Sequence, residues 1–313
     1  MVPPAMATQS PMPGGGSRLY QVHVLTLLAN FLVSSSFPVG HAITHGFEPG
    51  VLMLIRFVMA AVIMGFFVGL RYGIAWPGWG SLARYALLAA MPVGFFWCMF
   101  ESLRFTSALN TSAFFTTVPG ISAVVAAIFI GERLGWHRLV ALAIGMVGAL
   151  WVVFRGDIDR VAAFDLNYGD FLFLGGCLFF GVYGVLVKHL HRGEPTAIMT
   201  FWVLVIAALF YLAIAAKDLA AADWIGAGIG VYGGAAYLAL VTTVITFFLF
   251  QYATPRIGPT RVQAYSYFIP GFVLLTEWAL GRGLPPLMTL PGIGLVLVAS
   301  YFIQRGSAIE EAR

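Results

Sequence analysis

Three ionisable residues lie inside long apolar runs of the sequence: Arg56, Glu101 and Glu277. A charged side chain is costly in the hydrocarbon of a bilayer, so each of them is a candidate for function. The guanidinium of Arg56 can attract a carboxylate or a phosphate, or it can join helices by pairing with a carboxylate or with helix-end carbonyls. Glu101 and Glu277 can serve as proton-coupling carboxylates.

The two glutamates differ in their neighbours. Glu101 has Arg104 three residues along the chain, so the alternative to a coupling role is an interfacial ion pair. Glu277 has no basic residue three or four positions away, and Arg282 is five positions away. Glu277 is therefore the stronger candidate for a coupling group.

A histidine and a lysine stand at matching places in the two halves of the chain. His41 and Lys188 each precede a Glu-Pro pair by six or seven residues. His41 can titrate near neutral pH, although it also fits a solvated loop residue. Lys188 lies near a helix end, where a lysine can extend its ammonium group to the lipid headgroups.

Polar and aromatic side chains outnumber charges within the apolar runs. Hydroxyl and amide groups bind polar solutes without the desolvation cost of a fixed charge, and rings offer stacking or cation–π contacts. The alternative is adhesion, because small and hydroxyl residues let membrane helices approach closely. The residues expected to line a substrate cavity are Asn30, Ser34, Trp97, Asn110, Ser112, Thr116, Tyr237, Thr243, Gln263 and Tyr267.

The composition decides what surrounds these residues. Of 313 residues, 60% are hydrophobic and 10% are charged, whereas a soluble domain carries about 25% charged residues. This composition excludes a soluble enzyme, a disordered chain and a nucleic-acid binder. The net charge of +4 is also too thinly spread to form a basic patch. No spacing of Cys or His predicts a metal site, and no phosphate loop or nucleophile motif predicts an enzyme or a cofactor.

Ten apolar runs are long enough to cross a bilayer at about 20 residues each. Backbone groups in lipid must be bonded within the protein, and the alternating segments of a β-barrel are absent, so we expect helices. The sequence predicts an all-α integral membrane protein with a disordered tail at residues 1–18 and a second tail at 305–313. The expected spans are residues 19–40, 49–70, 81–103, 108–130, 137–154, 170–188, 195–216, 225–252, 259–280 and 284–303.

The basic residues are unequally divided between the two sides of such a bundle. With the N-terminus in the cytoplasm, eleven of the 17 lie inside and five outside, and Arg56 lies within a span. Cytoplasmic segments carry an excess of Lys and Arg, so both tails are predicted to be cytoplasmic. We expect the plasma (inner) membrane of a bacterium, with the polar segment 155–169 outside.

The two halves of the chain resemble each other. Asn110 and Pro119 correspond to Arg261 and Pro270 at an offset of 151 residues, and the Glu-Pro pairs recur at an offset of 146. Each half has five spans, an odd number, so the second half must be inverted relative to the first. We therefore predict inverted five-helix repeats at residues 19–154 and 170–304, joined by an external linker at 155–169.

Several short motifs follow one another in a recognisable order. They include residues 54–57 (Leu-Ile-Arg-Phe), residues 131–134 (Gly-Glu-Arg-Leu), Gly169-Asp170 and Phe201-Trp202. Over residues 20 to 305 this order resembles the EamA-type repeat of the drug/metabolite transporter superfamily. Two positions depart from it: the lysine common at the end of the first span is His41, and the second Gly-Glu pair is Gly281-Arg282.

The resemblance implies a secondary or facilitative transporter of small metabolites that works by alternating access. Export of amino acids or related amphipathic solutes is the leading expectation. The expected partners are a small-molecule substrate and membrane lipid, and the chain is expected to be a monomer or a weak homodimer. Two alternatives stay open: a membrane-embedded enzyme or flippase for lipid-linked substrates, and a channel or non-transporting partner subunit.

The coupling role of Glu277 gives a first prediction. Replacing Glu277 by Gln removes the titratable group, so transport in proteoliposomes should lose its response to an imposed pH gradient. The measurement is the initial rate of transport with and without the gradient. An unchanged response in E277Q contradicts the coupling role.

Overall fold

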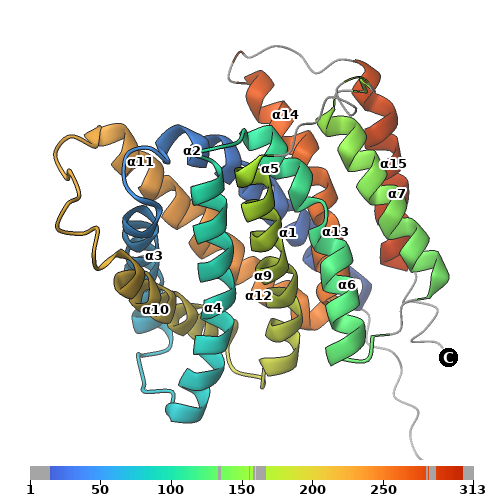
Figure 1. Cartoon of the computed structure of the whole chain (residues 1–313). Helices are drawn as coiled ribbons and strands as arrows, with labels where there is room; N and C mark the ends of the chain where they lie inside the picture. Colours follow the sequence, from blue (N-terminus) through green and yellow to red (C-terminus); the bar gives the residue numbers. More distant parts are fainter. Residues whose placement is uncertain are drawn as a thin grey trace, which may run out of the picture.

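The computed structural model describes residues 15–132, 135–154, 156–157, 159, 167–279, 281 and 287–305, without the side chains of residues 15–18, 109, 277 and 305. Within these residues the chain is helical and has no β-strand. Nine helical segments of the described chain are long and apolar enough to cross a membrane, and a run of short helices over residues 259–279 adds a tenth. The predicted all-α, ten-helix membrane fold is confirmed, and the helices form one bundle (Figure 1).

Five spans make up the first half of the chain. They are α1 (Gly15–Ser34) with α2 (Ser36–Ile43), α3 (Pro49–Arg71), α4 (Trp79–Ser102), α5 (Ala108–Phe115) with α6 (Val118–Phe129), and α7 (Trp136–Val153). Helix α1 begins at Gly15, inside the segment predicted as a tail, and residues 1–14 lie outside the described residues.

Five further spans make up the second half. They are α9 (Tyr168–Leu190), α10 (Thr196–Ala215), α11 (Gly228–Ala239) with the π-helix η1 (Leu240–Ile245) and α12 (Thr246–Ile257), α13 (Pro259–Ala264) with the 3-10 helix η2 (Tyr265–Phe268) and α14 (Ile269–Ala279), and η3 (Leu287–Thr289) with α15 (Leu290–Arg305). The predicted linker lies mostly outside the described residues, as do residues 306–313.

Local sequence signals set several helix starts. The side chain of Ser107 accepts a hydrogen bond from the backbone N–H of Asn110 at 3.1 Å and so caps α5. Asn167 and Asp170 form a capping box at the start of α9. Gly258, with φ +85°, makes the turn from α12 to α13, a backbone conformation that favours glycine.

The fourth and ninth spans break at matching places. The fourth is interrupted at Thr116 and Thr117, between α5 and α6, and Pro119 follows. The ninth is interrupted by η2, and Pro270 follows. Both breaks fit the offset of 151 residues found in the sequence. Proline has no backbone N–H to donate to the preceding turn, which is consistent with an interruption of the helix just before each of these residues.

Aromatic rings fill the centre of the bundle. The ring centroid of Phe95 on α4 lies 4.6 Å from that of Phe180 on α9 and 4.9 Å from that of Phe96. Phe96 in turn stacks against Phe247 on α12 at 6.2 Å. All four rings are buried. The core therefore joins helices from both halves of the chain.

An ion pair joins two helix ends at one side of the bundle. Arg84 on α4 lies 3.3 Å from Glu194, which precedes α10, and also donates to the carbonyl of Leu190 at 2.7 Å. Burial alone raises the pKa of the Glu194 carboxyl. Hydrogen bonds from the backbone N–H groups of Glu194 and Arg192, together with the charge of Arg84, outweigh it and lower the pKa overall.

Helices α7 and α15 lie side by side at one edge of the bundle (Figure 1). A Cβ atom added at Gly292 on α15 would lie 2.6 Å from the carbonyl oxygen of Gly148 on α7. A Cβ atom at Gly148 would lie 2.8 Å from the carbonyl oxygen of Gly292. These two glycines let the backbones approach closely, as small residues do between membrane helices.

This contact gives a prediction. Gly292→Ala should destabilise the folded protein by about 1–3 kcal/mol, because the new methyl group meets backbone rather than a flexible side chain. Gly294→Ala on the same helix is the matched control, since its Cβ would have no atom within 4 Å. Thermal unfolding in detergent measures both variants. Equal midpoints for the two would contradict the close contact.

Candidate functional site

Arg56 lies on α3 and is fully buried in the bundle. Its Nε donates to the hydroxyl of Thr243 at 2.7 Å. Its Nη2 donates to the hydroxyl and to the carbonyl of Thr242 at 3.0 and 3.3 Å. Its Nη1 has no hydrogen-bond partner in the structure. Arg56 thus joins α3 to the eighth span through one edge of the guanidinium, and Nη1 stays unused.

The π-helix η1 explains how neighbouring threonines face the same arginine. A π turn closes from residue i to i+5, so it changes the direction of successive side chains relative to an α-helix. The hydroxyls of Thr242 and Thr243 both donate to the carbonyl of Leu238, at 3.1 and 2.9 Å. Since their protons are used there, both oxygens present lone pairs to Arg56.

A narrow cavity lies beside this cluster. The open space at its centre is ≈ 10 Å³, about enough for a single water molecule. The guanidinium carbon of Arg56 lies 4.1 Å from the ring centroid of Phe96, which lines the cavity together with Thr242. The cavity is lined by Val33, Ser36, Phe37, Phe95, Phe96, Met99, Phe180, Thr242, Thr246, Phe247 and Phe250. A metabolite can enter only if some of these rings move.

The electrostatics of the site are one-sided. No acidic residue is among those that line the cavity, and no described carboxylate forms an ion pair with Arg56. Three ring faces surround the guanidinium at 4.1 to 6.0 Å, those of Phe57, Phe96 and Phe100. Cation–π attraction to these rings offsets part of the cost of burying the charge. A positive charge without a counter-ion therefore adjoins a largely apolar cavity.

Several of the residues predicted to line a cavity bond to their own helix. The amide of Asn30 donates to the backbone carbonyl of Thr26 at 2.9 Å. The hydroxyl of Ser34 donates to the backbone carbonyl of Phe31 at 2.6 Å, and the hydroxyl of Thr116 donates to the backbone carbonyl of Ala113 at 2.6 Å. All three predicted residues are buried, and none lines the cavity beside Arg56.

Other members of the predicted set are scattered. Trp97 on α4 is 36% exposed on the outside of the bundle. The hydroxyl of Tyr237 lies 2.8 Å from that of Ser35. Asn110 takes part in the cap of α5 through its backbone, Ser112 is buried, and Gln263 is buried beside Gly184. Thr243 also belongs to the predicted set, and its hydroxyl accepts a hydrogen bond from the buried Arg56.

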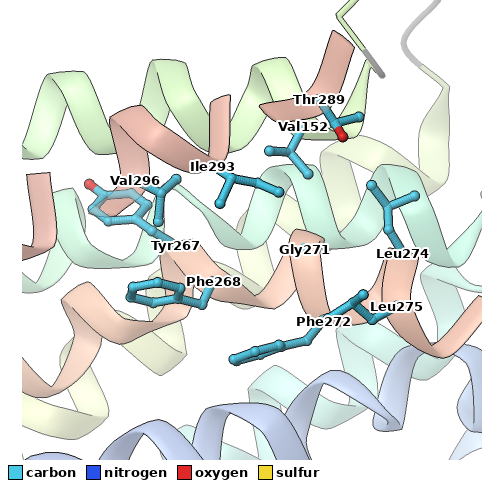
Figure 2. A pocket seen from close by; sticks show the side chains of 10 residues that line it. All are labelled: Val152, Tyr267, Phe268, Gly271, Phe272, Leu274, Leu275, Thr289, Ile293 and Val296. Carbon is cyan, nitrogen blue, oxygen red and sulfur yellow. The ribbon is translucent and has the colours of Figure 1, made fainter. Parts of the chain in front are cut away.

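Tyr267 belongs to a different hollow. An apolar groove of ≈ 150 Å³ lies between α7, α14 and α15 (Figure 2). Its polar groups are the hydroxyls of Tyr267 and Thr289, and that of Tyr267 donates to the carbonyl of Leu142 at 2.8 Å. The ring of Tyr267 also packs where a Cβ on Gly145 would lie, 2.6 Å away. This groove offers no charged group to a polar solute.

The two predicted glutamates lie near helix ends. Arg104 binds both carboxylate oxygens of Glu48, at 2.7 and 3.1 Å, and lies 3.4 Å from Glu101, so the interfacial ion pair weighed for Glu101 is present. The hydrogen bond to Glu48, more than burial, shifts the pKa of Arg104 and raises it. Helix α14 carries Glu277, whose side chain lies outside the described residues.

His41 and Lys188, the matched residues of the two halves, lie in different parts of the bundle. The Nδ1 of His41 donates to the carbonyl of Leu103 at 3.3 Å. Lys188 is half-buried near the end of α9, where a Cβ on Gly258 would lie 3.9 Å from its Nζ. Neither residue lines the cavity beside Arg56.

Sequence reasoning missed the rings that close the cavity, above all Phe96 and Phe247. A phenylalanine in an apolar run carries no signal that separates the core from the lipid face. The sequence did place two successive hydroxyl residues, Thr242 and Thr243, in the eighth span, and Thr243 was among the residues expected to line a cavity. The sequence did not indicate that these groups would meet.

The fold and the site define a polytopic membrane protein with a central cavity between two repeats, an architecture typical of secondary transporters. The family model described as EamA-like transporter family matches residues 21–154 and 167–305. The chain therefore belongs to the EamA-like transporter family, which confirms the resemblance found in the sequence.

Individual proteins show the same relationship. The uncharacterized transporter YyaM of Bacillus subtilis (strain 168) is 22% identical over 279 residues, which cover 88% of this chain and 90% of that protein. A probable terminal-alkyne amino-acid exporter of Streptantibioticus cattleyicolor is 23% identical over 87% of this chain and 89% of its own length. A crystal structure with 16% identity matches with a TM-score of 0.72, covering 91% of this chain and 97% of that one, and so shares the fold.

The contact between Arg56 and η1 gives a prediction. Thr243→Val keeps the shape of the side chain but leaves the charged Nε without an acceptor, so it should destabilise the protein by about 1–3 kcal/mol. Thr254→Val is the matched control, because Thr254 is equally buried and its hydroxyl bonds only to the carbonyl of Phe250. Thermal unfolding should show the larger loss for T243V. Equal losses would contradict the arginine contact.

Proposed function

We propose that this protein is a secondary or facilitative carrier of small amphipathic metabolites related to amino acids, and that it exports them. The observation that carries the proposal is the buried Arg56 beside a cavity of aromatic rings. Such a site offers one charged contact and an apolar surface, which suits a solute with one polar end. A relative named as a probable amino-acid exporter supports the same class.

Alternating access fits the irregular helices around the site. The cavity is too small for a metabolite in this conformation, so the surrounding spans must move for a solute to enter. The break in the fourth span, the π-helix η1 and the 3-10 helix η2 all interrupt the regular ladder within membrane spans. Departures of this kind mark functional hinges. We propose that the halves of the bundle tilt about these interruptions.

The orientation and the driving force belong to the same proposal. We propose that both tails are cytoplasmic and that the membrane is the inner membrane of a bacterium, on the distribution of basic residues. Glu277 remains the proposed coupling group, and the ion pair with Arg104 argues against the same role for Glu101. The carrier is proposed to work as a monomer or a weak homodimer.

Counterflow tests the carrier directly. Proteoliposomes loaded with unlabelled leucine or phenylalanine and diluted into traces of the labelled amino acid should accumulate label transiently and saturably above protein-free liposomes. Phe96→Trp, which adds bulk at the cavity, should lower the initial rate at least tenfold. Phe66→Trp is the matched control, because Phe66 is 71% exposed on the outside of the bundle.

The other outcomes distinguish the alternatives. Flux that neither saturates nor shows counterflow indicates a channel. Chemical change of a lipid-linked solute indicates an enzyme. No saturable flux for either amino acid, with folded protein confirmed by gel filtration, contradicts the proposed substrate class.

A further inference from the structure

The unused edge of Arg56 is the most unusual polar feature of the membrane interior. Every acceptor that its guanidinium contacts is neutral: two threonine hydroxyls and one backbone carbonyl. These bonds involve Nε and Nη2, and Nη1 is buried with no partner. A buried charged group with unmet hydrogen bonds is expensive, so a group left in this condition points to a missing anion.

The described carboxylates do not fill this place. Glu194 pairs with Arg84, Glu48 and Glu101 pair with Arg104, and Glu132 pairs with Arg138. These pairs lie at helix ends, away from the centre of the bundle. None of these carboxylates is therefore the anionic partner of Arg56, and a bound solute can supply that anion.

The geometry favours one carboxylate over a doubly charged anion. One guanidinium supplies one positive charge, and none of the residues that line the neighbouring cavity is basic. A planar carboxylate matches the donors of a guanidinium, and a charge-assisted bond of this kind is about twice as strong as a neutral one. Phosphate monoesters carry close to two negative charges at neutral pH, so one charge would stay uncompensated.

The residues that line the cavity also indicate which other groups of the solute can be bound. Eight of the eleven have apolar aliphatic, thioether or aromatic side chains, and the polar ones are the hydroxyl residues Ser36, Thr242 and Thr246. Because no lining residue is acidic, an ammonium group would find hydroxyls and ring faces but no opposite charge. The amine of an amino acid is then dispensable.

We propose that the cavity binds the carboxylate of its solute on Nη1 of Arg56, with the apolar part of the solute in place of the ring of Phe96. The ring of Phe96 stacks on the guanidinium of Arg56 and also lines the cavity, so displacement of this ring would open the cavity to the guanidinium. The inference rests on the proposed carrier function and names its substrate class: monocarboxylates with an apolar side chain, with or without a free amine.

Matched ligand series test this substrate class on the purified full-length protein. One series is 3-phenylpropionate, phenylalanine, N-acetylphenylalanine and phenylalaninamide, and the other is 4-methylpentanoate, leucine, N-acetylleucine and leucinamide. In at least one series the three carboxylates should raise the unfolding temperature, as ligands of the native state do. The amide should bind at least tenfold more weakly than the acid.

Variants then assign the carboxylate to Arg56. Arg56→Gln should weaken binding of the acids at least tenfold and leave binding of the amide unchanged, and Arg56→Lys should restore part of it. Arg71→Gln is the matched control, because Arg71 is an exposed arginine at the end of the same helix. If R56Q does not fold, the comparison of acid with amide in the native protein decides the question.

Four results overturn the inference: amides that bind as well as acids, amino acids that bind only with a free amine, phenyl phosphate that binds more tightly than the carboxylates, and no binding of any acid in either series. Counterflow with the same preparation separates this failure from that of the carrier function. Saturable counterflow of an amide or an amine without response to acids retains the carrier and removes the carboxylate site.

Discussion

A backbone polar group inside a bilayer has no water to bond with, so it must find its partner within the protein. The ten helices satisfy this constraint, and their interruptions are tolerated where other groups take over. Thr242 and Thr243 bond to the carbonyl of Leu238 in the π-helix, and Arg56 bonds to the carbonyl of Thr242. The irregular part of the eighth span is thus held by side chains, and it is also the part that meets Arg56, whose side chain is fully buried.

The helices of the bundle pack in two ways. At one edge, Gly148 and Gly292 bring α7 and α15 into backbone contact. At the centre, rings from both halves interlock and leave room for about one water molecule. A carrier needs this contrast, because elements that pack backbone to backbone stay together while a centre of side chains can rearrange. The cavity beside Arg56 lies among the side chains of that centre.

Much of the fold follows from the sequence alone, and less of the site does. Apolar runs located the ten spans, because a helix must be long enough to cross the hydrocarbon. Pro119 and Pro270 correspond in the two halves of the sequence, and the fourth and ninth spans are interrupted beside them. The partners of Arg56 did not, since nothing in the sequence shows which of many threonines lies across the bundle from it. The sequence also did not predict the π-helix at Leu240–Ile245, because these residues do not differ in pattern from those of an ordinary membrane helix.

The sequence by itself determined the membrane setting, the helices, the repeat and the position of Arg56 within an apolar span. The tertiary structure decided which residues face inward. Phe96 lines the cavity whereas its neighbour Trp97 lies on the outside, yet both are large aromatic residues on one helix. In water, apolar character marks the buried face of a helix. In a bilayer, lipid tails are as apolar as the core, so that signal vanishes and packing alone separates the two.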